Sequence, residues 1–261
     1  MTLALTPVMV SKLGLADFGA WVLLTGLFSQ FSLLDPGLQS SLPRFLVQRE
    51  PGRHRGVAST AQFIYLLVTA ACIGLTLAVW VLLPWFTVET AHLSTARHIT
   101  ILLGAATAAG ALFRLPALHL QSLMRRDLIA LIATGRVLVC AAAVFWLLQW
   151  RGGGLLQVAL VHASGAIVES LLLAWFGRSL GSSLRWRWVD RAVARELLGF
   201  SGWAYVISVC DRLRPGLDAF VLGWLRGSPA TGVYNLGARP VWMMADVVYA
   251  AYGWFGHPDP S

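Results

Sequence analysis

Long apolar runs, separated by short polar segments, dominate the sequence. A membrane-spanning helix needs roughly 20 mostly apolar residues to cross about 30 Å of hydrocarbon, and most of these runs reach that length. The pattern therefore predicts an all-α membrane protein with about seven or eight transmembrane helices. The runs cover approximately Thr2–Leu13, Phe18–Leu34 with a continuation at Leu38–Val47, Ala58–Phe86, Ile99–Leu120, Leu128–Leu148, Leu155–Phe176, Phe200–Leu225 and Gly232–Phe255.

Three places interrupt this pattern. The first run is only about a dozen residues long and contains Pro7, so it is either a short span or the C-terminal half of a longer helix. The fourth run is broken by Arg114 and Pro116. Between the sixth and seventh runs, Trp188–Leu198 mixes charged and apolar residues, which predicts a short amphipathic helix at the membrane interface.

Composition supports the membrane interpretation. The chain is 57% hydrophobic and 12% charged, whereas soluble domains carry about 25% charged residues. No nucleotide-binding P-loop, GxSxG or HExxH motif is present, so we expect neither catalysis nor a cofactor. His119 and His162 lack any metal-ligand spacing and are expected to be interior residues without a metal.

Basic residues alternate between poor and rich loops along the chain. The loops after the second, fourth and sixth runs hold 11 arginines, and the loops on the other side hold 4 basic residues. The positive-inside rule then predicts that the arginine-rich loops and the N-terminus lie on the cytoplasmic side of the plasma membrane. This distribution explains the net charge of +8 better than nucleic-acid binding does, because no basic face is formed.

The cysteines and the N-terminus carry little further information. Cys72, Cys140 and Cys210 each lie inside an apolar run and are expected to be small buried side chains, without a disulfide. No basic segment or cleavage site resembling a signal peptide precedes the first run, so the first spans are expected to direct insertion.

A glycine-aromatic pattern occurs twice. Gly14, Gly19 and Trp21 have the same spacing as Gly227, Gly232 and Tyr234, at an offset of 213 residues. Each copy lies between an odd-numbered run and the next one, so both copies should have the same orientation in the membrane. This arrangement predicts a parallel duplication of six-span halves, of which the second is incomplete here. Gly19 and Gly232 are then expected at the same membrane face.

Five segments carry a further signal, namely Leu13–Trp21, Leu33–Leu38, Leu42–Phe45, Phe200–Trp203 with Asp218, and Gly232–Arg239. These segments resemble polysaccharide biosynthesis flippases of the MOP superfamily, which also contains the MATE exporters. This resemblance implies two six-helix lobes around a central cavity, and movement of undecaprenyl-diphosphate-linked oligosaccharide from the cytoplasmic to the periplasmic leaflet of the bacterial inner membrane. Membrane lipids and a coupling ion would be the other partners.

The domain organisation follows from the runs together with this resemblance. We expect a first lobe at 1–177, a cytoplasmic loop with the amphipathic helix at 178–199, and the first two spans of an incomplete second lobe at 200–261. Two alternatives stay open at this stage. One is a MATE-like exporter of small cations, and the other is an inactive fragment or membrane scaffold.

Charged residues inside the apolar runs are the candidate site. Asp211, Arg214 and Asp218 are spaced i, i+3, i+7 and therefore share one helical face. This stripe is either a stabilising set of ion pairs or the polar wall of a cavity, in which Arg214 would suit a diphosphate. The further cavity candidates are Arg239 and Asp246 around Pro240, and Arg114, Arg136 and Glu169. Arg114 and Arg136 have an alternative role near helix ends, where their side chains would reach the interface.

Overall fold

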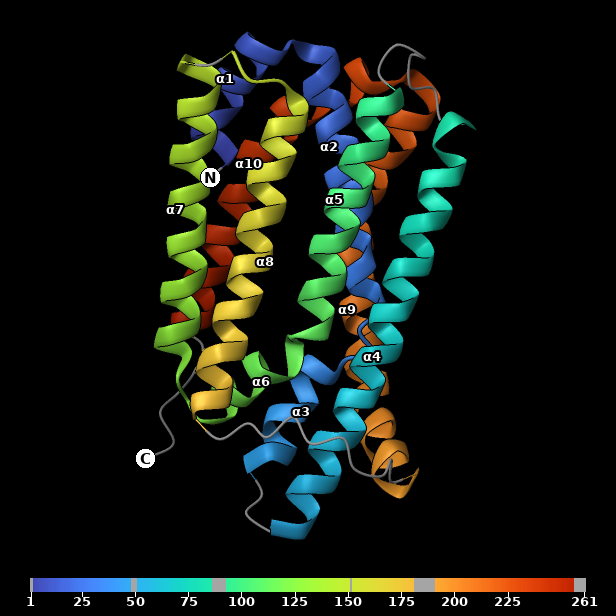
Figure 1. Cartoon of the computed structure of the whole chain (residues 1–261), viewed down its shortest axis with the longest axis vertical. Coiled ribbons are helices and arrows are strands. Elements are labelled where there is room, and N and C mark those ends of the chain that lie inside the picture. Colours follow the sequence, from blue (N-terminus) through green and yellow to red (C-terminus); the bar gives the residue numbers. More distant parts are fainter. Residues whose placement is uncertain (1, 48–50, 86–92, 151, 181–190, 256–261) are drawn as a thin grey trace.

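The computed structural model describes residues 2–47, 51–85, 93–150, 152–180 and 191–255, which are all helices and short connections without a strand. Long helices run side by side along the longest axis of the molecule (Figure 1). In hydrocarbon, helices satisfy their backbone hydrogen bonds internally, which explains this architecture. The first half contains α1 (Thr2–Leu13), α2 (Leu15–Ser29), the 3₁₀ helix η1 (Gln30–Leu34), α3 (Leu38–Val47), α4 (Pro51–Leu82) and η2 (Leu83–Trp85). The second contains α5 (Leu93–Leu112), α6 (Arg114–Ser122), α7 (Arg126–Trp150), α8 (Leu155–Ser179), α9 (Arg191–Arg226) and α10 (Ser228–Phe255).

The membrane character of the fold is confirmed. Within the described ranges, four segments are long and apolar enough to cross a membrane, namely Leu15–Leu34, Gly56–Trp85, Arg126–Trp150 and Leu155–Ser179. A fifth is obtained if α5 and α6 are counted as one broken span. The predicted total of seven or eight spans stays a prediction. Many large apolar side chains on these helices are exposed, as a lipid-facing surface requires, for example Leu131 at 69% and Trp175 at 63%.

The break expected at Arg114 and Pro116 is present. The axes of α5 and α6 differ by 43° at Phe113. Proline has no N–H, so Pro116 cannot donate to the Leu112 carbonyl four residues earlier, while proline is tolerated in the first turn of α6. Arg114 consequently begins a new helix inside the bundle, and the bend sets the direction of its side chain.

Two details of the sequence prediction are wrong. The amphipathic segment does not form a helix of its own, because the described part of it belongs to α9, which runs without interruption from Arg191 to Arg226. The expected end of the amphipathic segment, at Leu198, is followed by Gly199 and not by a proline. Glycine destabilises a helix much less than proline does, so the helix can continue through this point. Pro240 lies within α10, which continues to Phe255. Among the cysteines, Cys72 and Cys140 are buried as expected, but Cys210 is exposed, and all three are free.

The two glycine-aromatic copies are alike in conformation. Gly14 and Gly227 have φ angles of 84° and 80°, a left-handed conformation that favours glycine. In each copy, the glycine N–H donates to the carbonyl four residues earlier, at 3.1 Å, and the next helix begins at once. The α1–α2 and α9–α10 connections are therefore equivalent tight turns.

The second glycine of each copy lies at the crossing of α2 and α10. A Cβ atom at Gly232 would be 3.2 Å from the Leu15 carbonyl oxygen and 3.6 Å from the Gly19 Cα. Gly19 is itself buried on α2, which packs extensively along α10. Gly19 and Gly232 therefore lie close together, at the same end of the helix bundle, as predicted. The division into lobes stays a prediction.

We expect Gly232→Leu to destabilise the protein. A leucine there would force α10 away from the backbone of α2, and overpacking typically lowers the free energy of unfolding by about 1–3 kcal/mol. Gly237→Leu is the matched control, because a Cβ at Gly237 on the same helix meets nothing within 4 Å. Thermal unfolding in detergent measures the difference. Equal melting temperatures for the two variants would contradict the close packing of α2 and α10.

Candidate functional site

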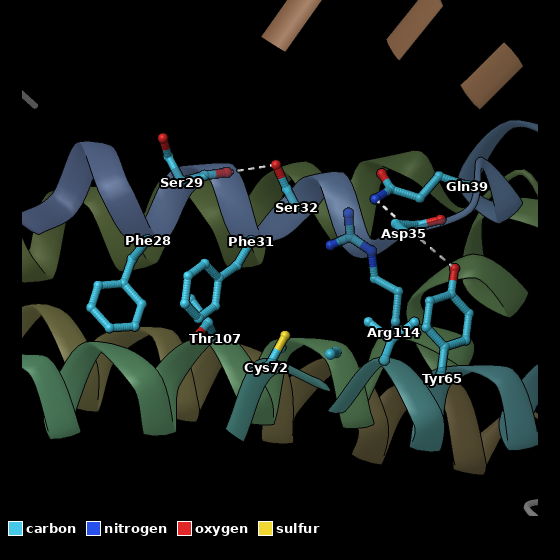
Figure 2. A pocket seen from close by; sticks show the side chains of 13 residues that line it. Phe28, Ser29, Phe31, Ser32, Asp35, Gln39, Tyr65, Cys72, Thr107 and Arg114 are labelled. Atoms are coloured by element: carbon cyan, nitrogen blue, oxygen red, sulfur yellow. Dashed lines mark hydrogen bonds between the residues drawn. The ribbon is translucent and has the colours of Figure 1, made fainter. Parts of the chain in front are cut away.

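A cavity of about 290 Å³ lies inside the bundle, between α2–η1, α4 and the α5–α6 bend. Its walls are apolar at one end and polar at the other (Figure 2). Phe28 and Phe31 form the apolar part, whereas Asp35, Gln39, Tyr65 and Arg114 carry the polar groups. The remaining lining residues are Ser29, Ser32, Val68, Cys72, Thr107, Gly110 and Ala111.

Asp35 is the centre of the hydrogen bonds at the polar end. Its Oδ1 accepts the N–H of Leu38 at 3.0 Å, which caps the start of α3. Its Oδ2 accepts the Gln39 amide Nε2 at 2.9 Å and the Tyr65 hydroxyl at 3.3 Å. Tyr65 is only 1% exposed, so its ring is fixed by packing. Three neutral groups thus hold this carboxylate in one orientation.

Arg114 lines the same cavity but, unlike Asp35, has no hydrogen-bond partner among the described residues. Among the residues that the structure describes, no hydrogen bond or ion pair involves its guanidinium. Figure 2 shows the side chain extending into the cavity beside Asp35. The N-terminus of α6, where Arg114 lies, adds a partial positive charge from the helix dipole. A half-buried guanidinium that pairs with no described residue favours an anionic ligand at such a place, above all a phosphate that accepts two hydrogen bonds at once.

Arg136 and Glu169 form an ion pair of their own. The Arg136 Nε and Glu169 Oε2 atoms are 2.9 Å apart, although the N–H does not point at the oxygen, so the contact is electrostatic rather than a hydrogen bond. The side chains are 29% and 21% exposed. A Cβ at Gly165 would collide with the Cys140 sulfur, so this glycine allows α7 and α8 to approach beside the pair. Neither charge lines the described cavity, and the arrangement fits a stabilising role.

The other candidates from the sequence are only partly described. Asp218 is exposed and accepts the Tyr234 hydroxyl at 2.7 Å, which joins α9 to α10. The side chains of Asp211, Arg214, Arg239 and Asp246 lie outside the described residues, so the predicted stripe on the seventh span is untested. His162 contacts Trp21 edge-to-face with ring centroids 5.5 Å apart, and His119 is buried and has a partner, as expected for interior histidines. No group of residues that could hold a metal ion occurs in the described part of the chain.

Sequence reasoning found Arg114 but missed Asp35, Gln39 and Tyr65 as site residues. In the sequence, Asp35 was noted only as part of Leu33–Leu38, one of the segments that resemble the flippase family. Tyr65 is one aromatic residue among many in an apolar run, and its hydroxyl meets Asp35 across 30 positions of the chain. An acidic residue followed by Pro-Gly between two apolar runs was the available signal.

Comparison with known proteins decides the family. The model of the family described as "Polysaccharide biosynthesis protein" matches residues 2–254. The chain belongs to this family. Membership of this family suggests a role as a membrane flippase or exporter. No curated protein and no solved structure matches the chain significantly.

We expect the ion pair between α7 and α8 to contribute to the stability of this family member. Arg136→Leu leaves the Glu169 charge unpaired, and an unpaired charge at mid-membrane costs about 2.5–3.5 kcal/mol. The double variant Arg136→Leu/Glu169→Leu should regain most of the lost stability, because it removes both charges. Arg125→Leu is the control, since its contact with Asp127 is exposed and 3.6 Å long. A double variant no more stable in thermal unfolding than Arg136→Leu would argue against the pairing.

Proposed function

We propose that this protein is a flippase that moves undecaprenyl-diphosphate-linked oligosaccharide across the bacterial inner membrane for surface polysaccharide synthesis. The observation that carries the proposal is the Arg114 guanidinium, which pairs with no described residue and lies at the polar end of a cavity in the helix bundle. A lipid-linked sugar combines a diphosphate, which suits a guanidinium, with hydroxyl groups, which suit amide and hydroxyl side chains. Membership of a polysaccharide biosynthesis family supports the same class of substrate.

Export of a small cation is the weaker alternative. It would use Asp35, the acidic residue of the cavity, as the attracting charge. The Asp35 carboxylate already accepts three hydrogen bonds, and a permanent positive charge lies in the same cavity. Both features lower the affinity for a cation, and the positive charge also raises the affinity for an anion. The polar end of the cavity therefore favours a phosphate-bearing substrate.

We expect Arg114→Ala to abolish most surface polysaccharide in the host cell, with the chromosomal copy replaced by the variant. Arg114→Lys keeps the charge but loses the planar fork, so we expect export to fall about tenfold or more at normal protein level. Arg125→Ala, at an exposed position, is the control. Cell-surface glycan and membrane protein abundance are measured together. Normal glycan in both Arg114 variants would overturn the role of this residue in transport.

We also propose that the arginine-rich end of the bundle faces the cytoplasm. Arg126 and Trp150 are the first and last residues of α7, and both are exposed. In a background without Cys72, Cys140 and Cys210, we expect a membrane-impermeant maleimide added outside to label Trp150→Cys but not Arg126→Cys. Permeabilised cells, in which both sites react, serve as the control. Labelling of Arg126→Cys alone in intact cells would reverse the orientation.

A further inference from the structure

Two opposite charges share the cavity without pairing. Asp35 and Arg114 both line it, yet no ion pair joins them, and Asp35 is bonded to neutral donors only. Opposite charges attract more strongly in a low-dielectric interior than in water, so a salt bridge would be the simplest outcome. A structure that avoids this salt bridge needs groups that hold the carboxylate away.

Gln39 and Tyr65 are placed to do this. Both donate to the same Oδ2 atom of Asp35, from α3 and α4 respectively. Figure 2 shows the Tyr65 hydroxyl and the Arg114 guanidinium at different sides of Asp35. The Tyr65 ring is buried and the Oδ1 atom is fixed by the cap of α3, so the carboxylate cannot easily rotate toward Arg114.

We propose that Tyr65 and Gln39 are positioning residues that keep Asp35 from occupying Arg114, so that the guanidinium is left for a phosphate of the substrate. This inference rests on the function proposed above. Without the Tyr65 hydroxyl, Asp35 becomes an internal competitor that mimics the anionic ligand. The cavity volume of about 290 Å³ is at the lower end for ligand sites, which fits a headgroup and not a whole oligosaccharide.

The test is a double-variant cycle on the purified chain in detergent, with geranyl diphosphate as the probe. Tyr65→Phe removes only the hydroxyl and should weaken binding about tenfold, because a hydrogen bond to a charged group is lost and Asp35 turns to Arg114. Asp35→Asn in the Tyr65→Phe background should restore the affinity, since a neutral amide cannot pair with Arg114 and asparagine still caps α3. A variant that merely damaged packing would not be rescued in this way.

The matched controls separate this mechanism from simpler ones. Tyr205→Phe makes the same change on α9 at a residue that does not line the cavity, and should leave binding unchanged. Geraniol tests for binding by the apolar chain alone. Inorganic pyrophosphate distinguishes the two sources of phosphate, since equal affinity for pyrophosphate and geranyl diphosphate would indicate a site for free phosphates and not for a lipid headgroup. Thermal unfolding confirms that each variant is folded.

The outcomes for the positioning role and for the proposed function are distinct. Loss of probe binding in Arg114→Gln, together with rescue of Tyr65→Phe by Asp35→Asn, supports both. Loss of binding in Arg114→Gln with an unaffected Tyr65→Phe, or with a double variant as weak as the single one, overturns the positioning role alone. A wild-type chain that does not bind the probe, or an Arg114→Gln variant that binds it normally, overturns both the positioning role and the phosphate site.

Discussion

The free energy of moving a charged group from water into hydrocarbon limits where charged side chains between the helices of this protein can lie. An unpaired charge at mid-membrane costs about 2.5–3.5 kcal/mol on insertion scales, and the described charges avoid that cost in different ways. Arg136 and Glu169 neutralise each other between α7 and α8. Asp35 is satisfied by three neutral donors. Arg114 has neither solution among the described residues, and its side chain lines the partly polar cavity, which makes that cavity the site of interest.

The helices followed from the sequence because the hydrophobic requirement is local. The bounds of α1 and the start of α8 agree with the apolar runs, and the break at Arg114 follows from the missing N–H of Pro116. The junction between the amphipathic segment and the seventh run was harder to predict from the sequence, because the glycine there permits both a helix and a turn. The continuous α9 reflects packing, since Leu197 near its start is fully buried against α3 and α4.

The composition of the site depended on tertiary contacts that no local pattern reveals. Arg114 was found because a charge in an apolar run is conspicuous by itself. Tyr65 has no such mark, and its role arises only because α4 brings its hydroxyl to a carboxylate on another helix. The charged residues could therefore be identified from the sequence. Which of them form an ion pair, which accept hydrogen bonds from neutral groups and which line a cavity could be seen only once the helices were arranged in space.

The contact between α2 and α10 also constrains how the chain is made. Gly19 and Gly232 are 213 residues apart, and at synthesis rates of about 5–20 residues per second α10 follows α2 after roughly 10–40 s. During that interval the glycine surface of α2 has no final neighbour. The α1–α2 hairpin must therefore remain at the insertion machinery, or be covered temporarily by lipid or another helix, until α10 arrives. The contact thus joins the α1–α2 hairpin to a helix that is made much later, so translation that stops before α10 leaves this surface of α2 without that partner.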